Sequence, residues 1–198
     1  MSVLTVYYSH ETDDEWDKLV RILEKTDAPE GCKVEIVEGI ITVAPPPSNA
    51  HNLINSKLIR CLSAALPDEW GLFPHVGIAV PSRQGLFIPD LVVALNDVLA
   101  TEEGHCIPAA AAELVAEITS PSNAYQDRIQ KAAAYSHAGI PLYLLIDAWT
   151  PGGPTVTLYG EPKGGLYRVL QTGKFGDPIR LPEPIGLDLE TGDFPAKG

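Results

Sequence analysis

Hydrophobic positions along the chain follow two periods, one typical of helices and one typical of strands. Apolar residues recur at helical spacing over about residues 12–25 and 49–66, and polar residues that favour a helix start open both runs. Between them, apolar residues surround the turn-forming dipeptide Glu38-Gly39, which predicts a hairpin. Further strands are expected at about 73–80 and 85–95. The second helix is expected to bury one face: Leu53, Ile54, Leu58 and Leu62.

In the middle of the chain the pattern changes to strand, helix and strand, at residues 114–119, about 124–137 and 142–147. A helix of this length between two apolar strands predicts a right-handed parallel crossover, so the sheet should be mixed. The segment 96–112 has no clear period and is interpreted as a surface loop with, at most, a helical turn.

The C-terminal part is expected to add an antiparallel hairpin beyond Pro151 and an irregular, turn-rich cover from Pro178. The whole chain, 1–198, is expected to form one domain. Its expected parts are a helical segment at 1–31, a core at 32–150, and the hairpin with its cover at 151–198. The predicted fold class is mixed α/β (α+β), with a mixed central sheet flanked by helices and added antiparallel hairpins.

The amino-acid composition indicates in which cellular compartment the protein is expected. Of 198 residues, 45% are hydrophobic and 20% are charged, which is ordinary for a soluble globular protein. Residues 1–8 lack a basic region followed by a long apolar core, so we expect no secretory signal. No apolar run approaches the length that spans a membrane. Three widely spaced cysteines argue against a disulfide framework and a structural zinc site. These features predict a cytoplasmic protein that does not enter a membrane.

The formal net charge of −12 bears on function. Much of the affinity of proteins for nucleic acid comes from neutralised phosphates. An acidic chain should therefore bind DNA weakly, unless basic residues gather locally or a divalent metal intervenes.

Two acidic residues interrupt apolar strands. Glu117 lies inside an apolar run, and Asp90 lies between Pro89 and another run. A buried carboxylate is costly unless a cation or hydrogen-bond donors accompany it. If the two strands are neighbours, the pair could hold Mg²⁺ or Mn²⁺, which prefer oxygen ligands. Such an ion polarises a phosphoryl oxygen and activates water, so phosphodiester hydrolysis is the chemistry that these residues favour.

Lys131, on the expected crossover helix, could bring positive charge to such a site. From spacing alone, the simpler interpretation is an exposed ion pair with Asp127, four residues earlier. His51, in the first turn of the second helix, is either part of the site or a solvated surface group. Motifs of phosphate-loop NTPases, dinucleotide enzymes, α/β hydrolases and zincins are absent from the sequence.

Seven segments, taken in order, resemble the Uma-two family of restriction endonucleases, a branch of the PD-(D/E)XK nuclease superfamily. The likeness extends over about residues 33–192. The matching segments are 34–41, 45–48 with His51, 89–93, 116–122, 127–135, 138–141 and 142–147.

The resemblance implies a restriction-endonuclease-like core and a Mg²⁺- or Mn²⁺-dependent site in which Asp90 and Glu117 hold the metal. Glu35 would be a further acidic member. The lysine usual two residues after the second acid is replaced by Thr119, and the family's shift of this lysine to the following helix selects Lys131. The implied substrate is nucleic acid, with DNA expected, and nucleases of this superfamily often act as homodimers.

The chain departs from the family at Ile88, where many relatives carry a basic residue, and at Leu144, where tryptophan is common. The first departure removes positive charge near the expected site. Two alternatives to an enzyme therefore stay open. One is a non-catalytic module that keeps the nuclease fold to bind a protein partner or to dimerise. The other is a small-ligand or structural protein whose strand acids are paired internally.

Overall fold

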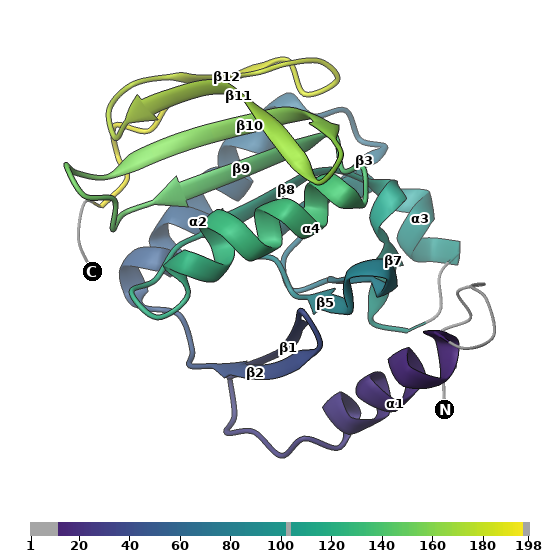
Figure 1. Cartoon of the computed structure of the whole chain (residues 1–198). Coiled ribbons are helices and arrows are strands. Elements are labelled where there is room, and N and C mark those ends of the chain that lie inside the picture. Colours follow the sequence, from purple (N-terminus) through teal and green to yellow (C-terminus); the bar gives the residue numbers. More distant parts are fainter. Residues whose placement is uncertain (1–11, 102–103, 196–198) are drawn as a thin grey trace.

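Two mixed β-sheets joined by short connections organise residues 12–101 and 104–195, the part of the chain that this computed structural model describes (Figure 1). The N-terminal residues 1–8, for which we expected no secretory signal, lie outside the described residues. The four α-helices of the described part are α1 (Thr12–Glu24), α2 (Asn49–Ala65), α3 (Asn96–Thr101) and α4 (Ala132–His137).

The larger sheet has six strands in the order β11-β10-β9-β8-β6-β3. These strands are β3 (Trp70–Phe73), β6 (Leu91–Leu95), β8 (Ala112–Ile118), β9 (Leu142–Asp147), β10 (Thr155–Lys163) and β11 (Leu166–Lys174). Only β8 and β9 run parallel, and the helical segment 124–137 connects them. The predicted crossover and the mixed sheet are therefore confirmed, as is the hairpin that β10 and β11 form.

The smaller sheet has the order β2-β1-β5-β4-β7, with β4 and β7 parallel. Its strands are β1 (Lys33–Val37), β2 (Ile40–Ala44), β4 (Gly77–Val80), β5 (Gly85–Phe87) and β7 (Cys106–Pro108). The predicted hairpin at Glu38-Gly39 is present, and both turn residues have positive φ (49° and 78°), as a tight two-residue turn requires. The fold thus contains a second mixed sheet beyond the one that the sequence predicts.

The prediction of single long strands at 73–80 and 85–95 is wrong, because each of these segments is divided between the two sheets. The first breaks at residues 74–76 and the second at 88–90. Each break contains a proline, Pro74 or Pro89, which has no N–H to donate to a sheet. The chain therefore passes from the smaller to the larger sheet at Asp90, immediately before β6.

Two segments expected to be irregular contain short regular elements. The segment 96–112 includes α3, β7 and the 3₁₀ turn η2 (Ala109–Ala111), apart from residues 102–103, which are not described. The C-terminal cover includes an antiparallel pair, β12 (Ile179–Leu181) and β13 (Leu187–Leu189). Elements of three to six residues are too short to show a period in the sequence. The division of the chain at residues 31 and 150 stays a prediction.

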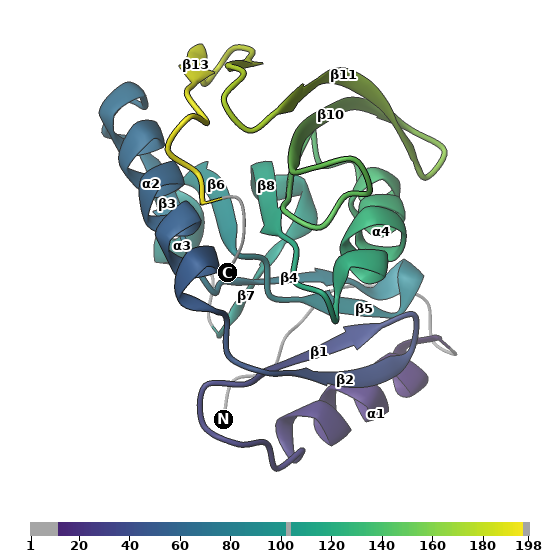
Figure 2. The same ribbon diagram turned by 90° about the vertical axis from the view of Figure 1, so that its left-hand side faces the viewer.

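Helices cover both faces of the larger sheet. Figure 2 shows α2 and α4 on opposite sides of β6 and β8. Alternating residues of β6 explain this: Leu91 and Val93 pack in the α2 cluster, whereas Val92 packs in the cluster that contains Tyr135 of α4. Ser48 caps α2, because its Oγ accepts a hydrogen bond from the N–H of His51 at 3.3 Å.

The buried stripe of α2 consists of Ile54, Leu58 and Leu62, spaced four residues apart. The prediction that Leu53 belongs to this face is wrong, because its side chain is 47% exposed. One residue of helix corresponds to a rotation of roughly 100°, which carries Leu53 away from the sheet.

Truncation of Leu58 tests this packing. We expect Leu58→Ala to lower the free energy of unfolding by about 2–5 kcal/mol, because it leaves a cavity in the core. Leu53→Ala on the same helix is the matched control, and it should change stability by no more than about 0.5 kcal/mol. Urea denaturation followed by circular dichroism measures both values. Equal losses in the two variants would contradict the assigned face.

Candidate active site

The break between the sheets brings Asp90 beside Glu117. Strands β6 and β8 are antiparallel neighbours in which Leu91 is paired with Ala116. Extending this register by one residue places Asp90 opposite Glu117, and directly opposed residues point to the same face of a sheet. Both side chains are buried, with 2% and 1% of their surface exposed. The structure therefore brings together the two acids that the sequence predicted as metal ligands.

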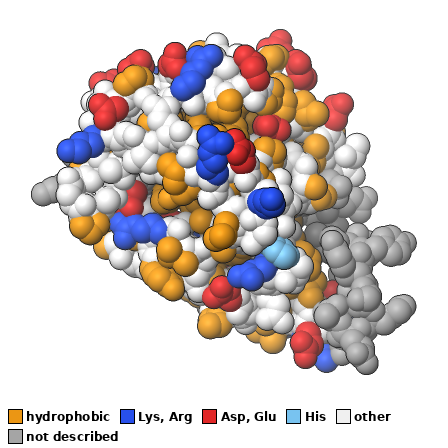
Figure 3. Space-filling model, turned by 45° about the horizontal axis from the view of Figure 1, so that its top comes forward, with side chains coloured by type: hydrophobic (Ala, Val, Ile, Leu, Met, Phe, Trp, Pro, Cys, Tyr) orange, Lys and Arg blue, Asp and Glu red, His pale blue; other side chains and the backbone are white. Residues whose placement is uncertain are grey.

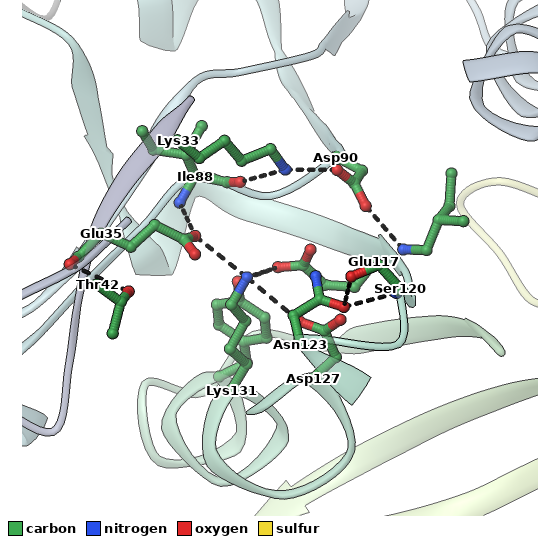
Figure 4. A network of polar contacts seen from close by, with 12 residues as sticks. Lys33, Glu35, Thr42, Ile88, Asp90, Glu117, Ser120, Asn123, Asp127 and Lys131 are labelled. Atoms are coloured by element: carbon green, nitrogen blue, oxygen red, sulfur yellow. Dashed lines mark hydrogen bonds and ion pairs between the residues drawn. The ribbon is translucent and has the colours of Figure 1, made fainter. Parts of the chain in front are cut away.

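Two further carboxylates and two lysines complete this group, which we call the charge cluster. Its members come from β1, from the segment before β6, from β8 and from the crossover helix, so it lies where the two sheets meet (Figure 4). The members are Lys33, Glu35, Asp90, Glu117, Asp127 and Lys131, all buried except for part of Lys33.

Lys131 lies between three of these carboxylates, as Figure 4 shows. Its Nζ is 3.1 Å from Glu35 Oε1, 3.1 Å from Glu117 Oε1 and 3.3 Å from Asp127 Oδ1. The alternative of an exposed Asp127–Lys131 pair is therefore wrong. The pair does form at the expected spacing, but both side chains are buried.

The crossover helix is a π-helix over η3 (Gln126–Lys131), before it continues as α4. π-Helical turns are rare, and they occur frequently at functional sites. Here the turn contains both buried charged residues of the helix, Asp127 and Lys131. Two tyrosines hold this arrangement: Tyr135 Oη donates to Glu117 Oε1 at 2.8 Å, and Tyr143 Oη donates to the backbone carbonyl of Asp127 at 2.8 Å.

Asp90 has a separate set of partners. Its Oδ1 lies 2.5 Å from Lys33 Nζ and 3.1 Å from His51 Nε2, and its Oδ2 accepts a hydrogen bond from the N–H of Ile118 at 2.8 Å. Lys33 Nζ also donates to the carbonyl of Ile88 at 3.1 Å. His51 is only 10% exposed, so the solvated alternative for this residue is wrong.

Sequence reasoning missed Lys33 as a member of the site. A signal was available, since Lys33 and Glu35 are two residues apart on one strand and must point to the same face. Glu35, which was predicted, accepts a hydrogen bond from the N–H of Ile88 at 2.7 Å through Oε1. The same oxygen contacts Lys131, so Glu35 links the smaller sheet to the crossover helix.

The cluster changes the pKa of its lysines and of Asp90. Burial lowers the pKa of both lysines, but the surrounding carboxylates outweigh it, above all Asp90 for Lys33 and Glu117 for Lys131. Both lysines are therefore charged at neutral pH. Burial raises the pKa of Asp90, but the hydrogen bond from His51 and the charge of Lys33 together hold it well below its usual value.

The pKa values of Glu117 and Asp127 change in the opposite direction. Burial raises both, and the charge of Lys131 only partly compensates. The rise is larger for Asp127, whose two carboxylate oxygens have no hydrogen bond among the described residues. The cluster thus shifts the pKa values of its carboxyl groups in opposite directions, down for Asp90 and up for Asp127.

A cleft of about 280 Å³ opens above the cluster. Lys33, Glu35, His51 and Lys131 line its inner part, whereas Asp90 and Glu117 are not among its lining residues. The outer walls come from residues 44–48, residues 119–123 and Trp149. Both lysines of the charge cluster therefore contribute to the lining of the cleft.

The donor set fits a hard divalent cation. Among the described residues, no three His, Cys, Asp or Glu side chains form a metal site alone. Mg²⁺ needs only one or two carboxylates, because it keeps several waters. Glu117 Oε2 is buried without a hydrogen-bond partner in the described chain, which leaves one oxygen free to bind a metal.

Comparisons with known proteins show which fold and which family this chain resembles. A solved structure described as a "putative nuclease belonging to DUF820" from Anabaena variabilis has a similar fold, with a TM-score of 0.69. It is 21% identical, and the match covers 89% of this chain and 96% of that one. The two proteins therefore share a nuclease-type fold.

The family follows from the sequence match. The model of the Uma2 family, described as "Putative restriction endonuclease", matches residues 16–192. The chain belongs to this family of restriction-endonuclease-like nucleases, as the resemblance predicted. A search of curated proteins found no match. Among the described residues, no helix is both long and apolar enough to cross a membrane.

The raised pKa of Asp127 predicts a pH dependence of the metal-free protein. Above the ordinary value of 3.8, the folded state keeps a proton that the unfolded state has lost, so stability should fall as pH rises. Asp127→Asn removes this contribution. We expect the variant to lose less stability than the wild type between about pH 5 and pH 8, measured by urea denaturation with a chelator present.

Asp68→Asn, at an exposed position, is the matched control and should keep the wild-type pH dependence. Parallel stability curves for the wild type and Asp127→Asn would show that the Asp127 carboxyl does not hold a proton in the folded state.

Proposed function

We propose that this chain is a Mg²⁺- or Mn²⁺-dependent endonuclease that hydrolyses phosphodiester bonds of nucleic acid, with DNA as the expected substrate. Asp90 and Glu117 would hold the metal, and Glu35 and Lys131 would complete the catalytic site. The observation that carries the proposal is the pairing of two buried acids across β6 and β8, where Glu117 Oε2 has no partner among the described residues. Membership of a restriction-endonuclease-like family supports it.

When bound, the divalent ion would polarise a phosphoryl oxygen and lower the pKa of a water molecule. Lys131 is charged, because the carboxylates around it raise its pKa, so it can donate hydrogen bonds but cannot accept a proton. Its role would be to orient the attacking water or to stabilise charge on the phosphate. Glu35 would position Lys131 through the 3.1 Å contact between Oε1 and Nζ.

Metal ligation is the first test of this proposal. Isothermal titration calorimetry should detect Mn²⁺ or Mg²⁺ binding to the wild type that Asp90→Asn and Glu117→Gln abolish. Cleavage of plasmid or oligonucleotide DNA should require the same ion. Lys131→Met should reduce the cleavage rate by about 10²–10³-fold, since it removes a cation next to the reacting phosphate.

Glu113→Gln, on β8 but outside the charge cluster, is the control and should bind metal as the wild type does. Metal binding that persists in both acid variants would place the ion elsewhere and would end the proposal.

A second candidate function is a module that keeps the nuclease fold without catalysis and binds a protein partner or a second copy of itself. The pairing of Asp90 with Lys33 and of Glu117 with Lys131 favours it, since the acids already have internal cations. Absence of metal-dependent binding and cleavage would select this candidate. A homodimer stays a prediction for both, and sedimentation of the purified protein tests it.

Lys33 gives a further prediction for the nuclease proposal. Its ammonium contacts Asp90 Oδ1, which a metal would also need, so metal binding should displace it toward the cleft that it lines. Lys33→Met should therefore tighten Mn²⁺ binding by about threefold or more, because the internal competitor is lost. Calorimetry measures this change. The exposed Lys25→Met is its control, and weaker binding by Lys33→Met would show that Lys33 supports the metal site instead.

A further inference from the structure

Among the large apolar residues that line the cleft, Trp149 is the most exposed. It follows the end of β9, lines the cleft, and keeps 41% of its surface exposed. Single exposed apolar residues are common on protein surfaces, but an aromatic ring among polar groups in a concave site is typical of ligand contact. The apolar wall that residues 45–47 form adds to this character.

The backbone of Trp149 is held in place by Asp147, a buried residue. Asp147 Oδ1 accepts hydrogen bonds from the N–H of Trp149 at 3.0 Å and from Thr119 Oγ1 at 2.9 Å. Arg128 donates to the same carboxylate from Nε at 2.6 Å and from a terminal nitrogen at 2.9 Å. These bonds connect the ends of β8 and β9 to the crossover helix. The ring is thus attached to an ordered segment, which reduces the entropic cost of binding.

The lysines that line the cleft are already paired with carboxylates. Among the described residues that line it, the cations are Lys33 and Lys131, and both contact carboxylates. Arg128 is paired with Asp147. On the face seen in Figure 3, Lys and Arg side chains are separated from one another and form no continuous basic surface. Few phosphates can therefore be neutralised, and affinity has to come from uncharged contacts.

We infer that this cleft binds an unpaired nucleotide, with the base stacked on Trp149, so that the substrate is single-stranded or locally unpaired nucleic acid. The inference rests on the proposed nuclease function. The faces of bases are covered by their neighbours in a duplex, and they become available to an aromatic ring only when the strand is unpaired. The volume of about 280 Å³ suits one small molecular unit.

Binding without cleavage tests this inference. Fluorescence anisotropy of labelled DNA should be measured with the wild-type protein and a chelator, which prevents metal-dependent cleavage and keeps the ion pair of Lys33 with Asp90. The single strand should bind more tightly than the matching duplex. Trp149→Ala should weaken single-strand binding by about 5- to 150-fold, and Trp149→Phe should retain most of the affinity.

The control is Tyr125→Ala, which removes an exposed aromatic residue of the crossover segment that does not line the cleft. It should bind as the wild type does. Circular dichroism verifies that each variant is folded.

Salt dependence provides a second measurement. With no more than about two phosphate contacts, the logarithm of the binding constant should fall with a slope of roughly −1.4 or shallower against the logarithm of salt concentration. A slope steeper than about −3 would show that phosphate contacts dominate. That slope, tighter binding of the duplex, or unchanged affinity in Trp149→Ala would each overturn the inference.

The two proposals fail in different ways. Metal-dependent cleavage without dependence on Trp149 would refute the unpaired-base subsite and leave the nuclease function intact. Trp149-dependent binding by a protein that neither binds metal nor cleaves DNA would refute catalysis but leave a single-strand-binding site. Absence of detectable single-strand binding would overturn the inference directly.

Discussion

The burial of six charged side chains at the junction of the two sheets is the constraint on which the rest of the structure depends. A buried charge without a partner costs several kcal/mol, so each carboxylate and lysine of the charge cluster requires the others nearby. Strand β1, the break before β6, strand β8 and the crossover helix must therefore meet at one place. The apolar core brings the same elements together, because one cluster contains residues of β1, β6, β8 and α4.

The sequence was sufficient to predict the acids and the elements around them. Glu117 and Asp90 could be found because they interrupt apolar strands, and the strand–helix–strand order predicted the parallel pair β8 and β9. The sequence hypothesis required the strands of Asp90 and Glu117 to be neighbours, and the pairing of β6 with β8 fulfils this condition. Their partners could not all be found. His51 joins Asp90 only because the chain changes sheets at residue 90, and that change depends on prolines within segments that otherwise have strand patterns. Local periodicity contains no information about which distant residues meet there.

The net charge of −12 conflicts less with the proposed nuclease function once the distribution of charge is considered. Much of the negative charge near the site is compensated internally by Lys33 and Lys131. Thr119 lies two residues after Glu117, and its hydroxyl donates to Asp147. The end of β8 thereby helps to order the segment that carries Trp149, while the crossover helix places Lys131 beside Glu117.

The π-helical turn makes the site depend on the number of residues in the crossover helix as well as on their identity. An ordinary α-helical turn over the same six residues would rotate everything beyond it by roughly 100°, because a π-turn holds one residue more per turn. Lys131 and Tyr135 would then leave Glu117 together, although neither had been replaced. The position of the Lys131 ammonium is thus set by the π-helical turn, and an α-helical turn in its place would remove the ion pairs that connect the crossover helix to both sheets.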